Sequence, residues 1–457
     1  MTHAHQTALL TQGSVARRLA GLTAPMVWGL MAAVSQPIVD TYFVGQLGTP
    51  QLAAMSYIFP IAFIFSSVII GLGIGTSAVL SRLIGAQHWE GVRQTNTHGL
   101  LLTFAVVAAL MLIGLVSLHT LFSVMGAGPE VMAFIARYMK IWYGSILILA
   151  LPMAGTASLR AKGASLAASS IMTMSALANL ILDPILIFGY FGAPEMGFVG
   201  AAWASVGANL AASLLAIYIL VVRENLLDFH RPDWTAMIAD WRSILQVGLP
   251  AALTNLISPL SAAVVVSIVS GLGEAAVAGF GVAVNVEAFA LIVPQALSAI
   301  IGPFVGQNFG AGLTGRIHRG MALTLSVGAG YGALMAVVLA LSAHWIGARF
   351  RDDPQVIAAA ATYLALVPAS YCFVAVIMVV AGAFNALGAP RPNMMFYAVK
   401  LIGLYIPLAA LGVRIFGFTG VAYAAALSNI LTGVLAFYWY RTYFPALTNR
   451  AAPAMHR

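Results

Sequence analysis

The feature that most constrains this chain is an apolar run from Pro25 to Gly48, PMVWGLMAAVSQPIVDTYFVGQLG, which contains a single carboxylate, Asp40. A run of about 20 apolar residues is long enough to cross the hydrocarbon core of a bilayer as a helix. A carboxylate in such a span costs about 2.5–3.5 kcal/mol to insert, so it normally faces a bundle interior or a water-filled cavity. We therefore expect Asp40 to mark the path of an ion or a proton.

The remainder of the chain repeats this pattern. Of its 457 residues, 61% are hydrophobic and 7% are charged, whereas soluble domains are about 25% charged. The pattern therefore predicts an all-α membrane protein with twelve transmembrane helices. The predicted spans are 17–44, 52–80, 94–118, 130–158, 165–188, 198–222, 241–270, 277–305, 317–343, 355–384, 393–415 and 419–440.

The distribution of positive charge predicts the orientation of these spans. Fifteen of the 21 Lys and Arg residues fall on one alternating set of connecting segments, and five fall on the opposite set. Cytoplasmic loops carry the excess of positive charge in membrane proteins, so both termini are expected in the cytoplasm. The same rule explains the net charge of +8 without a nucleic-acid partner. The polar N-terminal segment lacks a signal-peptide pattern.

Two halves of the chain repeat at an offset of 225, with Gly48 against Gly273 and Gly163 against Gly388. Each half holds an even number of spans, which predicts two parallel six-helix lobes related by a pseudo-two-fold axis along the membrane normal. This arrangement is typical of a transporter with a site near the repeat interface. The predicted parts are an N-terminal tail 1–16, an N-lobe 17–222, a linker 223–240, a C-lobe 241–441 and a C-terminal tail 442–457.

Three of the thirteen acidic residues lie well inside predicted spans, namely Asp40, Asp183 and Glu287. The repeat places Val265 opposite Asp40 and Ile406 opposite Asp183. A structural role common to both halves would keep an acid in each half. The asymmetry therefore favours a functional role for Asp40 and Asp183.

The first span combines Asp40 with two prolines. Gln36 lies four residues before Asp40 and shares its helix face. Neither Pro25 nor Pro37 can donate a backbone hydrogen bond to the preceding turn, so the helix is predisposed to bend at both positions. A bend that follows protonation of Asp40 and an ordinary kink, which is common in membrane helices, both fit this pattern.

The fifth span places Asn179 and Asp183 on one helix face, and Pro184 releases the carbonyl of Leu180. Carboxylate, amide and carbonyl oxygens suit a hard cation such as sodium, so Asp40, Asn179 and Asp183 are a candidate Na⁺ site. The same groups could hold a proton, because burial and a neighbouring carboxylate both favour protonation. These residues leave H⁺ and Na⁺ open.

Further polar residues are candidates for a supporting role. Ser205 and Asn209 share a face of the sixth span, where they complete the site or make interhelical contacts. In the second half, Glu287 and Lys400 have opposite charges and form a candidate polar site, either paired in the interior or extended toward an interface. The single cysteine, Cys372, excludes an internal disulfide. The histidines show no metal-binding spacing and so give no metal signal. No catalytic residue and no cofactor are expected.

The segments PIVDTYFVGQLG, LRAKG, NLILDPILIFG and GFVGAAWAS, in this order, resemble the multidrug and toxic compound extrusion (MATE) family, from about Arg17 to about Arg441. The resemblance implies a monomeric multi-pass protein of the bacterial inner membrane that exports amphipathic, often cationic, small molecules by cation-coupled antiport. The resemblance places the chain nearer the DinF-like branch of the family than the NorM-like branch. Residues used by the DinF-like branch match Asp40, Asn179 and Asp183 in cation coupling, Pro25 in bending of the first helix, and Ser205 as a hydroxyl on the sixth span.

Two departures from the family pattern bear on this expectation. Gln36 stands where some relatives have a tyrosine, and the tenth span lacks the acid of the NorM-like branch. We therefore expect coupling to H⁺ rather than Na⁺, with protonation of Asp40 bending the first helix and weakening substrate binding. The alternative is a flippase for a lipid-linked precursor. A flippase predicts arginines that face the phosphate groups, yet the spans contain hardly any Lys or Arg.

Overall fold

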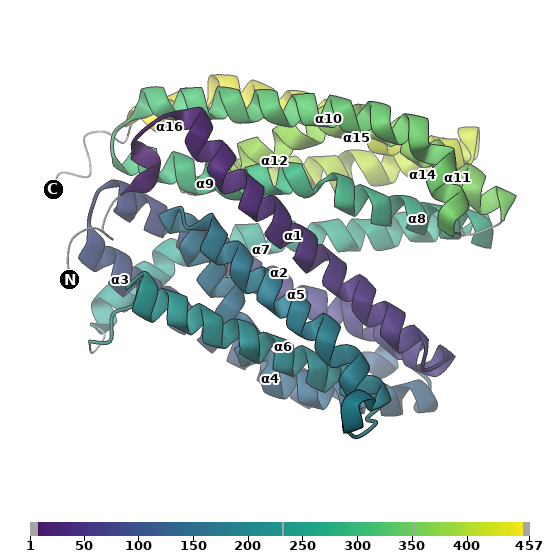
Figure 1. Ribbon diagram of the computed structural model, residues 1–457. Coiled ribbons are helices and arrows are strands. Elements are labelled where there is room, and N and C mark those ends of the chain that lie inside the picture. The colour runs from purple at the N-terminus through teal and green to yellow at the C-terminus, as the bar shows by residue number, and fades with distance from the viewer. Residues whose placement is uncertain (1–7, 231–232, 351–352, 451–457) are drawn as a thin grey trace. The chain divides into compact units, whose positions relative to one another are not determined.

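The structure is a computed structural model that describes residues 8–230, 233–350 and 353–450. All regular elements of these residues are helical (Figure 1). The helices of the first half are α1 (Val15–Gly45), α2 (Thr49–Gly85), α3 (Trp89–Val124), α4 (Pro129–Lys162), α5 (Ser165–Phe188) and α6 (Phe198–Ile217), and a π-helical turn, Tyr218–Arg223, extends α6.

The second half continues with α7 (Trp234–Ser270), α8 (Glu274–Ala290), α9 (Ile292–Gly310), α10 (Thr314–Phe350), α11 (Pro354–Leu366), α12 (Tyr371–Ala386), α13 (Arg391–Ala398), α14 (Ile406–Phe416), α15 (Phe418–Thr442) and α16 (Phe444–Arg450). A 3₁₀ turn, Val367–Ser370, joins α11 to α12, and a π-helical turn, Val399–Tyr405, joins α13 to α14. The expected all-α fold is confirmed.

Among the described residues, 11 helices are long and apolar enough to cross a membrane, and the count is 12 if the bent pair α8 and α9 is one span. This pair covers the span predicted at 277–305, but the helix axis bends there by 41°. Pro294 cannot donate to the carbonyl of Ala290, and the hydroxyl of Tyr331 on α10 donates to that carbonyl at 3.0 Å instead. The break is therefore stabilised by a neighbouring helix.

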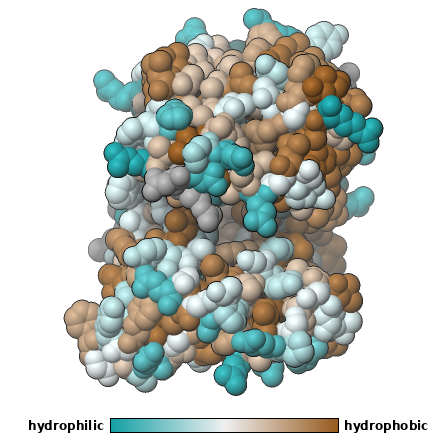
Figure 2. Space-filling model, turned by 90° about the vertical axis from the view of Figure 1, so that its right-hand side faces the viewer, coloured by the Kyte–Doolittle hydropathy of each residue, from teal (hydrophilic) through white to brown (hydrophobic). Residues whose placement is uncertain are grey.

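Many large apolar side chains lie on the outside of the helices. Val116 on α3 is 88% exposed and Leu341 on α10 is 85% exposed. Helices that are apolar on their outer faces suit a lipid environment. Figure 2 looks onto the end of the helices where α10 connects to α11, and hydrophilic residues are scattered among hydrophobic ones on this face.

The described residues divide into two compact units. The first contains residues 24–84 and 88–252, and the second contains residues 8–23, 85–87 and 253–450. The predicted lobes, 17–222 and 241–441, differ from these units at their edges. Helix α1 belongs to the second unit up to Thr23 and to the first from Ala24, and α7 changes from the first unit to the second after Ala252.

Close packing explains why the start of α7 belongs to the first unit. A Cβ atom on Gly71 of α2 would lie 2.5 Å from the Cβ of Ala252, and one on Gly75 would meet the carbonyl oxygen of Ile244. Glycines let the backbones of membrane helices approach closely. The polar linker in the sequence therefore does not coincide with the boundary that packing creates.

Each unit has its own apolar core. In the first, the ring of Phe65 packs against Trp142 and the ring of Tyr138 against Phe198, with ring centroids 5.3 and 5.2 Å apart. In the second, the ring of Phe280 packs edge-on against Tyr363.

Parts of the predicted tails, residues 1–7 and 451–457, lie outside the described residues. So do Arg231 and Arg351, which entered the count of positive charges.

Candidate functional site

Helix α1 carries Asp40 and runs without interruption from Val15 to Gly45, with Pro25 and Pro37 inside it. It packs closely on α5, because a Cβ atom on Gly29 would lie 2.8 Å from the Cβ of Ser169. The absence of a side chain at Gly29 thus permits the approach of the two helices. This approach lets residues of α1 reach the polar face of α5.

The structure brings the three predicted coupling residues together within the first unit. Asn179 and Asp183 lie one turn apart on α5, both 0% exposed, and the Asn179 side-chain amide donates to Asp183 Oδ1 at 3.4 Å. The half-buried Asp40 carboxyl lies within hydrogen-bonding reach of both side chains. Two carboxyl groups and one amide therefore meet at the contact between α1 and α5.

Three oxygens of this cluster have no hydrogen-bond donor among the described residues. They are Oδ1 of Asp40, Oδ1 of Asn179 and Oδ2 of Asp183, and all three are buried. Buried polar atoms are nearly always hydrogen-bonded, and exceptions require a specific explanation. A cation bound among these oxygens, either H⁺ or Na⁺, would satisfy them. Of the described residues, no group of three or more His, Cys, Asp or Glu residues could hold a metal ion.

Tyr138 is a member of this site that the sequence did not single out. It lies on α4, is 4% exposed, and its hydroxyl is a hydrogen-bond partner of Ser205 on α6. The hydroxyl also lies close enough to Asp40 and Asp183 to interact with both charges. Its position in an aromatic stretch, RYMKIWYG, resembles ordinary core packing. Sequence periodicity could not distinguish its hydroxyl from those of neighbouring tyrosines.

The other supporting residues have different positions. Ser205 is 9% exposed and contacts the cluster through Tyr138. Gln36 and Asn209 are half-buried, and the described part of the chain offers neither side chain a hydrogen-bond partner. The structure thus joins Ser205 to the acid pair through Tyr138 and, within the described residues, gives Gln36 and Asn209 no hydrogen bond to it.

The second unit has a separate polar group around Glu287 on α8. The Tyr363 hydroxyl donates to Glu287 Oε2 at 3.0 Å. Lys400 lies in the π-helical turn and interacts with Glu287 electrostatically, but the described residues show no ion pair between them. Val265, the repeat partner of Asp40, is fully buried in this unit's apolar core.

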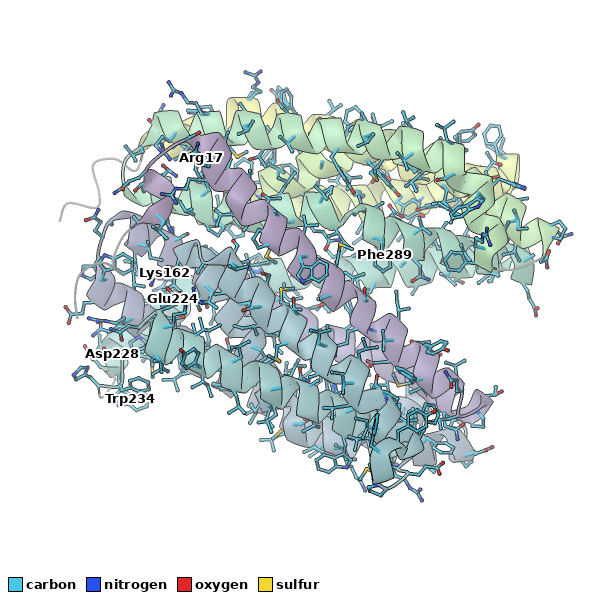
Figure 3. All side chains as sticks on the ribbon, viewed as in Figure 1. Arg17, Lys162, Glu224, Asp228, Trp234 and Phe289 are labelled. Atoms are coloured by element: carbon cyan, nitrogen blue, oxygen red, sulfur yellow. The ribbon has the colours of Figure 1, made fainter. Side chains whose placement is uncertain are left out.

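Charged contacts also fix the end of α4 in the first unit. Lys162 and Glu224 lie side by side in Figure 3, with Lys162 Nζ 2.8 Å from Glu224 Oε2. The Lys162 ammonium also donates to the Glu224 carbonyl at 3.1 Å. His98 Nδ1 lies 2.7 Å from Asp240 Oδ2, so the linker is bound to α3 as well. These contacts anchor the segment that follows α6.

Comparison with known proteins identifies the family. The MatE family model matches residues 25–185 and again residues 250–411. The chain therefore belongs to the MATE family of membrane transporters, which are not enzymes. The two matches begin at Pro25 and Pro250, 225 residues apart, in agreement with the internal repeat.

Individual relatives extend over nearly the whole chain. The FAD transporter of Shewanella oneidensis is 35% identical over 94% of this chain and 95% of its own. The probable multidrug resistance protein YoeA of Bacillus subtilis is 25% identical over 88% and 89%. Among solved structures, an aspartate-to-asparagine mutant of the Vibrio cholerae MATE transporter VcmN has a TM-score of 0.91 and 27% identity, covering 95% of this chain and 99% of that one. The expected fold and family are confirmed.

Proposed function

We propose that this protein is a proton-coupled antiporter that exports organic compounds from the cytoplasm. The observation that carries the proposal is the cluster of Asp40, Asn179 and Asp183, in which three buried oxygens lack a donor among the described residues. Intramembrane acids of this kind mark ion and proton pathways in transporters. The family assignment supports transport as the general function.

A proton fits the cluster with few additional groups. Two carboxyls within hydrogen-bonding reach repel each other when both are ionised, so we propose that they share one proton. Binding of a second proton would make the site neutral. Sodium would need further oxygen ligands beyond these residues, so H⁺ is the preferred coupling ion and Na⁺ the alternative.

Protonation would act on substrate binding through α1. A neutral Asp40 loses its attraction for a cationic substrate, and α1 is free to bend at Pro25 or Pro37, where a backbone hydrogen bond is missing. A ligand shifts a conformational equilibrium only by its differential affinity for the two states. Proton and substrate would therefore favour different shapes of α1 and exclude each other.

For the substrate, we propose amphipathic, often cationic, organic compounds, as in multidrug export. Two relatives are named for multidrug resistance or export, YoeA and the multidrug export protein MepA of Staphylococcus aureus, which supports multidrug export. FAD is a second candidate, because the Shewanella oneidensis relative named as an FAD transporter has the higher identity of 35%. We further propose that the protein is a monomer of the bacterial inner membrane with both termini in the cytoplasm.

The test is transport into inside-out vesicles that contain the purified protein. Ethidium, norfloxacin and FAD would be offered separately, with a pH gradient or a sodium gradient imposed in turn. Uptake of ethidium or norfloxacin driven by the pH gradient alone would support the proposal. Uptake driven only by the sodium gradient would show that the coupling ion is Na⁺ and not H⁺. Uptake of FAD alone would show that FAD, and not the drug-like compounds, is the substrate. No uptake of any compound by folded protein would refute it.

A further inference from the structure

A short segment before α1 is held in the second unit by hydrogen bonds to its backbone. Residues Leu9–Thr11 form a 3₁₀ turn, and the flanking Ala8 and the central Leu10 are each 1% exposed. The Leu10 backbone N–H donates to Gln307 Oε1 at 3.2 Å. The Asn308 side-chain amide donates to the Leu10 carbonyl, also at 3.2 Å.

Arg316, near the start of α10, completes this attachment. Its Nη1 donates to the Gly13 carbonyl at 2.8 Å and its Nη2 to the Leu10 carbonyl at 3.1 Å. Its Nε donates to Asn308 Oδ1 at 3.0 Å, which orients the amide toward Leu10. A planar guanidinium can make these bonds at once, whereas an ammonium cannot. The segment is thus bound through its own backbone to α9 and α10.

The beginning of α1 belongs to the same unit as this attachment. Residues 8–23 are part of the second unit, and α1 joins the first unit from Ala24. The change occurs one residue before Pro25, where the Gly21 carbonyl lacks its helical partner. One end of α1 is therefore fixed, and the weak point of the helix follows directly after the fixed part.

We propose that residues 8–13 are a latch that anchors the start of α1 to the second unit and confines its bending to the part from Ala24 onward. This inference rests on the proposed function, in which α1 changes shape with protonation. Without the latch, the first turns of α1 would follow Asp40, and protonation would displace the whole helix instead of bending it. The latch is a conformational device that converts a local change of charge into a bend.

Accessibility of a cysteine tests whether the latch exists, independently of transport. In a Cys372→Ser background, Leu10→Cys keeps the backbone bonds of the segment, and Ser14→Cys is an exposed reference. Both would be labelled with a membrane-impermeant maleimide in inside-out vesicles. We expect the cysteine at position 10 to react about tenfold more slowly than that at position 14. Equal rates would overturn the latch.

Substitution of Arg316 tests its role. Arg316→Ala should raise labelling at position 10 about tenfold and lower gradient-driven transport by a similar factor. Arg319→Ala, which removes an arginine further along the same helix, should change neither. Arg316→Lys retains the charge and should give intermediate labelling, which provides a second variant if the alanine protein does not fold.

The outcomes separate the latch from the coupling mechanism. Faster labelling with unchanged transport in Arg316→Ala would overturn the role of the latch in bending. If Asp40→Asn retains transport that responds to the gradient, the proposed function fails. If the cysteine at position 10 is still protected from labelling in that case, residues 8–13 are a structural attachment only, and the proposed link between the latch and bending of α1 is overturned.

Discussion

The most direct prediction concerns Asp40→Asn. Asparagine has nearly the same shape as aspartate, so packing between α1 and α5 should be retained. It cannot gain or lose a proton, so the cluster would keep Asp183 as its one titratable carboxyl. The substitution therefore removes proton exchange at Asp40 with little change in structure.

The proposed sharing of one proton sets the size of the expected effect. Asp40 and Asp183 lie within hydrogen-bonding reach, and if they share one proton as proposed, one further proton would exchange in each cycle. One proton moving down a pH difference of one unit supplies about 1.4 kcal/mol, which corresponds to about tenfold accumulation of substrate. We expect about tenfold accumulation by the unsubstituted protein and none above equilibrium by Asp40→Asn.

The assay is uptake of ethidium or norfloxacin into inside-out proteoliposomes, with the membrane potential clamped and the pH gradient set to one unit. Asp353→Asn is the matched control, because it makes the same chemical change at the N-cap of α11, where Asn caps as well as Asp. Accumulation that stays near tenfold in Asp40→Asn would refute the reasoning. Accumulation of about 100-fold in the unsubstituted protein would instead require two exchanging protons.

Three further predictions address the rest of the molecule. Glu287→Gln should keep transport within about threefold of the unsubstituted protein, or about 0.7 kcal/mol, because the proposed coupling residues all lie in the first unit. Gly420→Ala should lower the free energy of unfolding by about 1–3 kcal/mol or more, since its Cβ would collide with the Gly412 carbonyl. Lys162→Met should cost about 1–3 kcal/mol, because the half-buried Glu224 would keep only the exposed Arg223 as a charged partner, and removing both charges should cost less than the two single changes together.

Each of these predictions has its own check. If transport by Glu287→Gln no longer depends on the gradient, coupling involves the second unit as well. Thermal unfolding in detergent measures the stability changes predicted for Gly420→Ala and Lys162→Met. Gly330→Ala is the control for the collision, because a Cβ atom on Gly330 would have no neighbour within 4 Å; equal melting temperatures for the two alanine variants would contradict the packing argument. Additive costs of the Lys162 and Glu224 substitutions would show that their pairing contributes nothing.

Much of the architecture followed from local sequence patterns. Apolar runs long enough to cross a bilayer defined the spans, because the backbone must satisfy its hydrogen bonds internally in lipid and a helix does so. The repeat separated the halves, and the absence of partners for Asp40 and Asp183 in the second half marked the two acids. The helical period alone places Asn179 and Asp183 on one face of the fifth span.

Tertiary structure decided which helix faces meet. Helical periodicity defines a face but not its partner, so only the packing of Gly29 on Ser169 brings Asp40 to α5. The role of Tyr138 follows from its contact with Ser205, on a different helix.

The break between α8 and α9 and the anchoring of residues 8–13 depend in the same way on side chains distant in sequence. The Tyr331 hydroxyl donates to the carbonyl of Ala290, and the Arg316 guanidinium donates to the carbonyls of Leu10 and Gly13. These contacts form only after the helices have packed. The sequence by itself therefore determined the spans, the repeat and the acids, and the tertiary structure decided which of these groups act together, because long-range packing selects among faces that local patterns leave equivalent.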